Sequence, residues 1–520
     1  MKSFMKKKVL PLILLSVLVI ATGCQSIGGV DLNKMLVNQI MSDSMEGTMD
    51  LTLHLVPDQS AEADPETLEM IEAINGMQVV VESFKQQDLD TMSAIGKLII
   101  TRGEIPFQLS MSQTEMVMQI EGADAPIIVP LDSATNPLSD YTNMGDTDEL
   151  TIDPLQEKAL MESLASLIVN HLENPEDITV QRVTENIHGE SLSLYKIHSD
   201  IKGPEMLTLL KKFLRNLVMD DQAMKLFIAQ LYDVMKENAT EEDDILYGLG
   251  LGFGSTGSAD RELEIEFIHT FIKQGLLIFL MMLEDESMVA EFDPILNDDT
   301  YLRSDLFVDN SLHVRKSDFE LSISPEVADQ EDLEGISSVQ IEGHGQFWNH
   351  DKAVTADILT YEDEDALYMA DVTSFDDDFI SILDQESVLF KLLKEDLHAT
   401  RKTAIFYTVD DYEFMPYELA IVKNGIMTVP ARSLADNLGL QLDWNGVTRE
   451  LILTSPFDGT TVAFKVDSNK ATVNGTDETM PLATFISNGQ TYIPLRFVTD
   501  AIGAEIEWIQ ETSTAIVTIE

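Results

Sequence analysis

Histidine, cysteine and acidic side chains are the groups in this sequence that could carry out catalysis or bind a metal ion. The nine histidines are scattered, and the closest two in sequence are His344 and His350. On an extended strand their spacing places both imidazoles on one face but about 20 Å apart, too far for one metal ion to bridge. Only a bend at Gly343 and Gly345 would bring them together. We therefore expect no metal site at this pair.

Motifs for catalysis are missing from the sequence as well. There is no His-Glu-x-x-His motif and no Gly-x-Ser-x-Gly motif with a suitable histidine. The 91 acidic residues are so numerous that a pair of carboxylates indicates nothing without geometry. The acidic runs 362–365 and 376–378 offer oxygen ligands for Ca²⁺, but neither has EF-hand spacing, so we interpret both as solvated turns. We expect a non-enzyme without catalytic residue, metal or cofactor, and leave Ca²⁺ binding as an unsupported alternative.

The N-terminus has the pattern of an export signal with a lipid-attachment site. Lysines at positions 2 and 6–8 precede an apolar run at 9–20, and Ala-Thr-Gly-Cys then resembles a bacterial lipobox ending at Cys24. Cys24 is the only cysteine, so no intramolecular disulfide can form. We expect residues 1–23 to be a lipoprotein signal peptide and Cys24 to carry the diacylglyceryl anchor. An uncleaved membrane helix is the alternative, but the apolar run is short for a span.

The charge of the chain limits its partners. The formal net charge is −58, and cleavage before Cys24 removes four lysines, which gives −58 − 4 = −62. Such a protein repels nucleic acid, anionic headgroups and teichoic acids. We therefore expect no nucleic-acid partner, although solubility alone explains the charge equally well. The export signal and the lipobox predict an extracytoplasmic protein on the outer face of the cell membrane.

An internal repeat occupies the C-terminal end. Residues 424–432, NGIMTVPAR, return as residues 488–496, NGQTYIPLR, an offset of 64 residues that continues without a gap to Thr454 and Thr518. Asn-Gly predicts a turn, and the following apolar pair and proline predict a strand that leads into a short helix. Gly439 and Gly503 stand where a helix ends in a left-handed residue. Period-two alternation around Trp444 and Trp508 predicts a half-buried strand in each copy.

The repeated Val/Ile-Pro-x-Arg, the short helix ending in glycine and the following tryptophan resemble the copper amine oxidase N-terminal-like domain. This module recurs in exported proteins of Gram-positive bacteria. The resemblance implies an accessory domain separate from the copper-bearing catalytic part. Residues 416–520 contain neither His nor Cys, whereas copper takes imidazole or sulfur ligands, so we expect no copper here.

The motif residues of the repeat have a structural and a functional interpretation. They are Pro430, Arg432, Gly439, Trp444, Pro494, Arg496, Gly503 and Trp508. We favour a structural role: the two arginines paired with nearby acids, and the two tryptophans in the core. The alternatives are guanidiniums presented to the carboxylates of a wall polymer or partner, and exposed tryptophans that stack on carbohydrate.

The region between the signal and the repeat alternates strand and helix patterns. We expect strands near 48–55, 77–82, 92–121, 178–197, 301–323, 337–342, 354–359 and 367–372, and helices near 65–75, 154–171, 204–218, 221–236, 262–292 and 379–397. The apolar run 275–283 is too short to span a bilayer and is interpreted as a buried helix, with the wall of an acyl pocket as the alternative. The glycine-rich run 247–257 lacks the Lys-Ser/Thr of a phosphate loop.

The expected fold class is α+β, with antiparallel β-meanders, packed helices and a small C-terminal α+β domain of two pseudo-symmetric repeats. The expected parts are a signal at 1–23, a lipidated tether at 24–45, an α+β domain at 46–240, an acidic and glycine-rich linker at 241–260, a helix and second meander at 261–415, and the repeat domain at 416–520. Whether 46–415 is one domain or two stays open.

Strands with packed helices after a lipidated cysteine weakly resemble the LolA/LppX-like lipoproteins. We therefore expect a lipid-anchored protein of the cell envelope with a non-catalytic binding or scaffolding role through its repeat domain, toward a wall polymer or an envelope protein. The alternative is a lipid or lipoprotein carrier that uses a concave sheet.

Overall fold

A computed structural model describes residues 26–58, 65–131, 153–238, 260–326, 336–362, 366–369, 379–408, 419–455, 459–510 and 512–519. Its contacts divide the chain into two compact units. The first unit comprises the described residues of Met1–Glu121 and Ala125–Asp371. The second comprises Gly122–Asp124 and the described residues of Val372–Glu520. Each unit has its own sheets and its own core.

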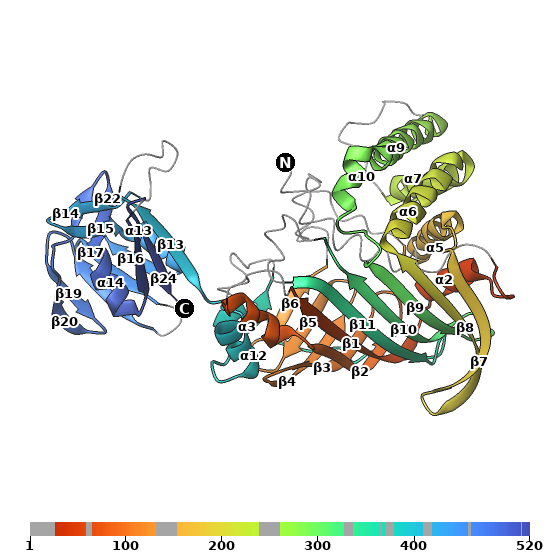
Figure 1. Cartoon of the computed structure of the whole chain (residues 1–520), viewed down its shortest axis with the longest axis horizontal. Helices are drawn as coiled ribbons and strands as arrows, with labels where there is room; N and C mark the ends of the chain where they lie inside the picture. Colours follow the sequence, from red (N-terminus) through yellow and green to blue (C-terminus); the bar gives the residue numbers. More distant parts are fainter. Residues whose placement is uncertain are drawn as a thin grey trace. The chain divides into compact units, whose positions relative to one another are not determined.

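The first unit is built on one twelve-stranded sheet (Figure 1). Its strands are β1 (Met45–Pro57), β2 (Gln78–Gln86), β3 (Met92–Ile100), β4 (Gly103–Met111), β5 (Glu115–Ile120), β6 (Ile127–Pro130), β7 (Asp177–Ile187), β8 (Glu190–Lys202), β9 (Tyr301–Val308), β10 (Val314–Ile323), β11 (Ile336–Trp348) and β12 (Leu367–Tyr368). They follow the order β12-β6-β5-β4-β3-β2-β1-β11-β10-β9-β8-β7. All neighbours are antiparallel except β12, which runs parallel to β6.

The pairing of β1 with β11 joins the early and late meanders. Leu51 lies opposite Gly343, and the pairing continues from Glu46 opposite Trp348 to Pro57 opposite Ile336. The strands of residues 46–202 and 301–348 therefore belong to one sheet. The sequence could not indicate this pairing, because these strands are separated by almost 300 residues and nothing local selects the partner.

Helices of the first unit begin and end where local chemistry favours it. They are α2 (Leu32–Ile40), α3 (Pro65–Ile74), α5 (Pro154–His171), α6 (Gly203–Met219), α7 (Asp221–Asn238), α9 (Arg261–Glu284) and α10 (Glu286–Phe292). Asp153 caps α5 by accepting a hydrogen bond from the amide of Leu155, and Asp260 caps α9 in the same way through Glu262. Figure 1 shows α5, α6, α7 and α9 side by side next to one part of the sheet.

Helix α6 covers one face of the sheet at β8, β9 and β10. Met206 and Leu209 of α6 pack with Ile201, Leu302 and Leu321 in one buried cluster. Alternate residues of a strand point to the same face, so this contact defines the helix side of the sheet.

Helix α2 covers a neighbouring part of that face, which differs from the expected tether at 24–45. Val30, Leu32 and Met35 are fully buried and pack against Ile197 and Val308. Val30 also forms a backbone bridge with Ile27. The apolar residues of this short segment find partners on the sheet, which the sequence pattern alone did not indicate.

Among its described residues, the second unit contains three small antiparallel sheets. Their strand orders are β13-β24-β23, β14-β15-β22-β21 and β16-β17-β18-β19-β20. The strands are β13 (Lys402–Tyr407), β14 (Ile421–Lys423), β15 (Ile426–Pro430), β16 (Gln441–Asn445), β17 (Glu450–Thr454), β18 (Thr461–Lys465), β19 (Lys470–Val473), β20 (Thr476–Thr479), β21 (Phe485–Ser487), β22 (Gln490–Pro494), β23 (Glu505–Ile509) and β24 (Thr514–Ile519). The helices are α12 (Val388–Lys391), the π-helix η3 (Leu392–Asp396), α13 (Ala431–Leu438) and α14 (Leu495–Ile502).

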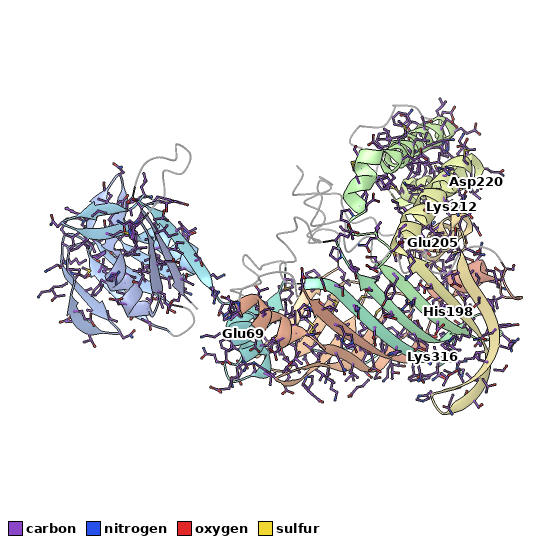
Figure 2. All side chains as sticks on the ribbon, viewed as in Figure 1. Glu69, His198, Glu205, Lys212, Asp220 and Lys316 are labelled. Carbon is purple, nitrogen blue, oxygen red and sulfur yellow. The ribbon has the colours of Figure 1, made fainter. Side chains whose placement is uncertain are left out.

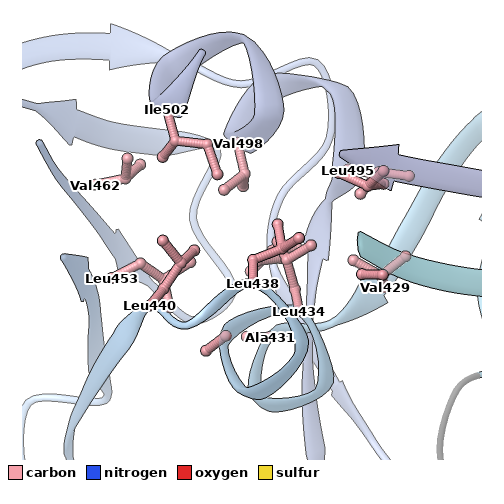
Figure 3. Close-up of a cluster of buried hydrophobic side chains, with 14 of the residues drawn as sticks. Val429, Ala431, Leu434, Leu438, Leu440, Leu453, Val462, Leu495, Val498 and Ile502 are labelled. Atoms are coloured by element: carbon pink, nitrogen blue, oxygen red, sulfur yellow. The ribbon is translucent and has the colours of Figure 1, made fainter. Parts of the chain in front are cut away.

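Two short helices supply the centre of the second core. Leu434 and Leu438 of α13 lie with Val498 and Ile502 of α14, and strand residues such as Val462 surround them (Figure 3). The apolar positions of each helix recur at helical spacing, and the opposite positions are polar and exposed.

Several expected boundaries differ from the structure. Residues 354–359 form no ladder strand; instead, the amides of Asp357 and Leu359 donate hydrogen bonds to the hydroxyls of Ser93 and Ser110 on the sheet. The helical pattern at 379–397 is interrupted: residues 379–381 are helical, and after a break α12 and η3 follow. The C-terminal fold begins earlier than residue 416, because β13 pairs with β24 along its whole length.

Candidate functional site

The predicted site residues of the repeat lie in the second unit, whereas Cys24 lies outside the described residues. The linker at 241–260, apart from Asp260, and most of both acidic runs are also outside them. Pro430 and Pro494 are buried N-cap residues of α13 and α14. Gly439 and Gly503 end these helices with φ of 67° and 73°, the left-handed conformation predicted for both.

Arg432 and Arg496 occupy the second position of α13 and α14, and both are exposed. Among the described residues, neither guanidinium forms a hydrogen bond or an ion pair, although Asp436 and Asp500 lie one helical turn further on. The expected pairing of each arginine with a nearby acid is therefore not found. Exposed guanidiniums can bind a carboxylate through two parallel hydrogen bonds.

Trp444 and Trp508 are 43% and 48% exposed, so their interpretation as core residues is wrong. The phase of the alternation was right: Trp444 lies opposite buried Leu451, and Trp508 lies opposite buried Ala515. Each tryptophan thus follows the inward face of its strand but lies near the strand's end, at the rim of the core. Alternation of apolar and polar residues predicts which face of a strand a residue lies on, but not how far along the strand the core extends.

A continuous apolar face on β1–β6 is the second candidate surface. Phe319 lies opposite Gly343, which lies opposite Leu51, so this face continues the side that α6 covers over β8–β10. Its apolar members are mostly half-buried. They are Met49, Leu51, Leu53, Val79, Val81, Leu98, Ile105, Phe107, Leu109, Met116, Met118, Ile120, Ile127 and Val129.

The opposite face of the sheet carries paired charges at β8–β11, among them His198 and Lys316, which are labelled in Figure 2. Asp305 contacts Lys196 at 2.8 Å and His198 at 2.8 Å, and Asp318 contacts Lys316 at 2.9 Å and His344. Burial opposes ionisation of Asp305, but the hydrogen bonds from Lys196 and His198 outweigh it and lower its pKa. Charges that are already paired at a surface stabilise the fold weakly, and we assign this face no ligand.

The histidine pair considered from the sequence is not brought together. His344 pairs with Asp318, whereas His350 is buried and stacks on His313 with ring centroids 4.8 Å apart. Within the described ranges, no group of three or more His, Cys, Asp or Glu side chains could hold a metal ion.

Helix α9 is a third candidate surface, and the expectation that residues 275–283 are buried holds only in part. Leu280 and Leu283 are buried, but Ile278 and Met281 are 59% and 66% exposed. By length and composition, α9 could cross a membrane, and little of it is buried. The sequence shows that Leu263, Ile278 and Met281 lie on one face of a helix. It does not show which face packs against other helices, because residues 275–283 are apolar on every face.

Comparison with known families identifies one part of the chain. Residues 408–517 match the family model of the copper amine oxidase N-terminal domain, which confirms the resemblance of the repeat region. That domain is a non-catalytic accessory domain, and the match indicates no catalytic family. No curated protein matches the chain.

Proposed function

We propose that this chain is a non-catalytic lipoprotein, anchored to the outer face of the cell membrane, whose C-terminal domain binds a carboxylate-bearing carbohydrate polymer of the cell wall. The observation that carries the proposal is the exposure of Trp444, Trp508, Arg432 and Arg496 at equivalent positions of the two sequence copies. The planar apolar surface of tryptophan suits a sugar ring, and a guanidinium suits a carboxylate.

The strand pairing at the centre of the domain supports two equivalent binding surfaces. Val429 of β15 lies opposite Ile493 of β22, and these residues are 64 positions apart, the offset of the repeat. Thr428 and Pro430 lie opposite Pro494 and Tyr492 in a reciprocal pattern. Such pairing has a local two-fold axis, so we infer a pseudo-symmetric pair of repeats. Two weak sites on one polymer then bind more tightly than either alone.

Co-sedimentation with purified peptidoglycan, stripped of teichoic acid, tests the binding role. The lipid-free chain from Gln25 to Glu520 should pellet with the polymer. The double variants Trp444→Ala/Trp508→Ala and Arg432→Ala/Arg496→Ala should each bind at least about tenfold more weakly, the effect of losing one hot-spot side chain or more.

Two matched substitutions control for nonspecific effects. Val447 is an exposed apolar residue of the same domain, and Arg449 is an exposed arginine paired with Asp467. Val447→Ala and Arg449→Ala should bind as the parent does. Absence of pelleting for the parent, or equal weakening by the controls, would remove the wall-binding role.

The anchor has a separate test. The full-length chain should be labelled by a radioactive fatty acid, and Cys24→Ser should abolish that labelling, because only the cysteine thiol of a lipobox accepts the diacylglyceryl group. A parent chain that carries no label and keeps residues 1–23 would support the membrane-helix alternative instead.

The apolar face of β1–β6 favours a second candidate, a carrier of acyl chains as in the LolA/LppX-like lipoproteins. Leu109 and Met118 lie opposite each other on that face, and Gln119 points to the other face. A fluorescent fatty acid should bind saturably to the lipid-free chain, at least about tenfold more weakly to Met118→Asp and equally to Gln119→Asp. Absence of saturable binding would remove this candidate.

A further inference from the structure

Helix α9 carries an apolar stripe that faces away from the protein. Here "the α9 stripe" means Leu263, Leu277, Ile278, Met281 and Met282, all exposed. Phe267, Thr270, Phe271 and Gln274 lie on the same face at helical spacing. Between Glu266 and Glu284 the helix carries one charged residue, Lys273, in a chain with a net charge of −58. Large contiguous apolar surfaces of this kind mark binding sites.

The opposite face of α9 fixes the direction of the stripe. Ile265 and Ile268 pack with Met224 and Tyr232 of α7, and Leu280 and Leu283 pack with Leu214 of α6. The flanking charges are also directed toward the neighbouring helices: Arg261 pairs with Asp233, Glu266 with Lys225, Lys273 with Asp221 and Glu284 with Arg215. The helix thus cannot rotate to bury its stripe without breaking both its core contacts and its ion pairs.

We propose that the α9 stripe docks into the interface of the lipid bilayer that holds the anchor, with the helix lying in the membrane plane. A helix of 24 residues is about 36 Å long, and a one-sided apolar stripe suits interfacial insertion of the helix. A transmembrane orientation of α9 is disfavoured. Helices α6 and α7 pack against its inner face and form ion pairs with it, so a spanning α9 would place these charged groups in the hydrocarbon.

The link between the anchor and the first unit is short, which favours the membrane as the partner of the α9 stripe. The proposal rests here on the proposed lipidation of Cys24. Val30 is fully buried in the first unit, so only residues 25–29 separate it from the lipidated cysteine. Six residue steps reach about 20 Å at most. The anchor therefore holds the first unit against the bilayer, and the α9 stripe is present at a high effective concentration relative to the lipid surface.

Vesicle flotation of the lipid-free chain, Gln25 to Glu520, tests the docking without the anchor. The parent should float with phosphatidylcholine vesicles, and Ile278→Glu/Met281→Glu should lower the partition coefficient at least about tenfold. Adding phosphatidylglycerol should weaken binding at low salt and NaCl should restore it, because the lipid charge repels the acidic chain.

The control variant makes the same charge change on exposed apolar residues of the second unit. Val447→Glu/Ile452→Glu should float as the parent does. Circular dichroism verifies that both variants are folded. Failure of the parent to float, or equal flotation of Ile278→Glu/Met281→Glu, overturns the proposal. Detection of a dimer by sedimentation velocity also overturns the proposal, if Ile278→Glu/Met281→Glu abolishes the dimer and the parent does not float.

The two proposals fail in distinguishable ways. If the full-length protein carries no fatty-acid label, the anchor is wrong and flotation of the lipid-free chain is unaffected. If the lipid-free chain does not float although Cys24 is lipidated, the docking is wrong and the anchor stands.

Discussion

At the residue scale, the surroundings of His350 favour its neutral form. Its Nε2 donates a hydrogen bond to the carbonyl oxygen of Val314 at 3.1 Å, and its buried Nδ1 has no hydrogen-bond partner among the described residues. Burial lowers its pKa to about 4, and the nearby His313 and Arg315 add to this, while Asp309 acts in the opposite direction. A second proton on the ring would have no acceptor and would lie beside other cations.

We expect His350 to make the first unit less stable in mild acid. The unfolded residue has a pKa near 6.5 and the folded one about 4, so the unfolded state binds more protons between these values. Stability is then complete above pH 6.5 and falls as the pH decreases toward 4. Between pH 7 and pH 5 the loss from this group is about 2 kcal/mol.

Urea unfolding of the parent and of His350→Phe at both pH values measures this loss. The variant keeps a flat ring beside His313 but cannot titrate, so its loss of stability between pH 7 and pH 5 should be smaller by about 2 kcal/mol. Acidic residues titrate in both proteins and cancel in the comparison. An equal loss in the two proteins would show that His350 does not cause the acid sensitivity.

At the element scale, the middle of the large sheet depends on a glycine beneath an aromatic ring. A Cβ added at Gly343 of β11 would lie 2.2 Å from the ring of Phe319 on β10 and 2.9 Å from Leu51 on β1. The ring covers the glycine from the neighbouring strand, an arrangement that fills the gap left by the missing side chain. The pairing of the two halves of the sheet thus requires a residue without a side chain at this point.

Gly343→Ala should lower the free energy of unfolding of the first unit by about 1–3 kcal/mol, because the Phe319 ring must move. Gly275→Ala is the matched control. It also adds one methyl group to the first unit, but nothing lies within 4 Å of it, and it replaces a helix-interior glycine of α9. The control should stabilise by about 0.5–1 kcal/mol. Equal effects of the two substitutions in denaturant titrations would contradict the steric account.

At the scale of the whole molecule, the chain has two separate cores. Clusters of the first unit lie on the helix side of the large sheet and between its helices, and a smaller one of Ile187, Leu194 and Phe307 lies on the opposite face; the cluster of the second unit lies around α13 and α14. Units with their own cores generally unfold as separate cooperative transitions.

Calorimetry of the lipid-free chain should therefore show two transitions. Gly343→Ala should lower the midpoint of one, and Gly503→Ala should lower the midpoint of the other. The added methyl at Gly503 meets open space, but its φ of 73° is a left-handed conformation that costs alanine about 1 kcal/mol. Gly503→Asn, which tolerates that conformation better, should restore part of the loss. A single transition shifted by both alanine variants would indicate one cooperative unit.

Features that depend on neighbours along the chain could be predicted from the amino-acid sequence. The repeat, the left-handed glycines 439 and 503, the helices α5, α6 and α7 and most of the sheet strands were predictable, because caps, turns and periodicity act over a few residues.

Which strands pair and which faces are covered could be learned only from the folded chain. The pairing of β1 with β11, the burial of α2, the exposure of Trp444 and Trp508 and the outward direction of the α9 stripe all depend on partners distant in sequence. An apolar residue is buried only where another element covers it, and the local pattern is the same whether that element is present or absent.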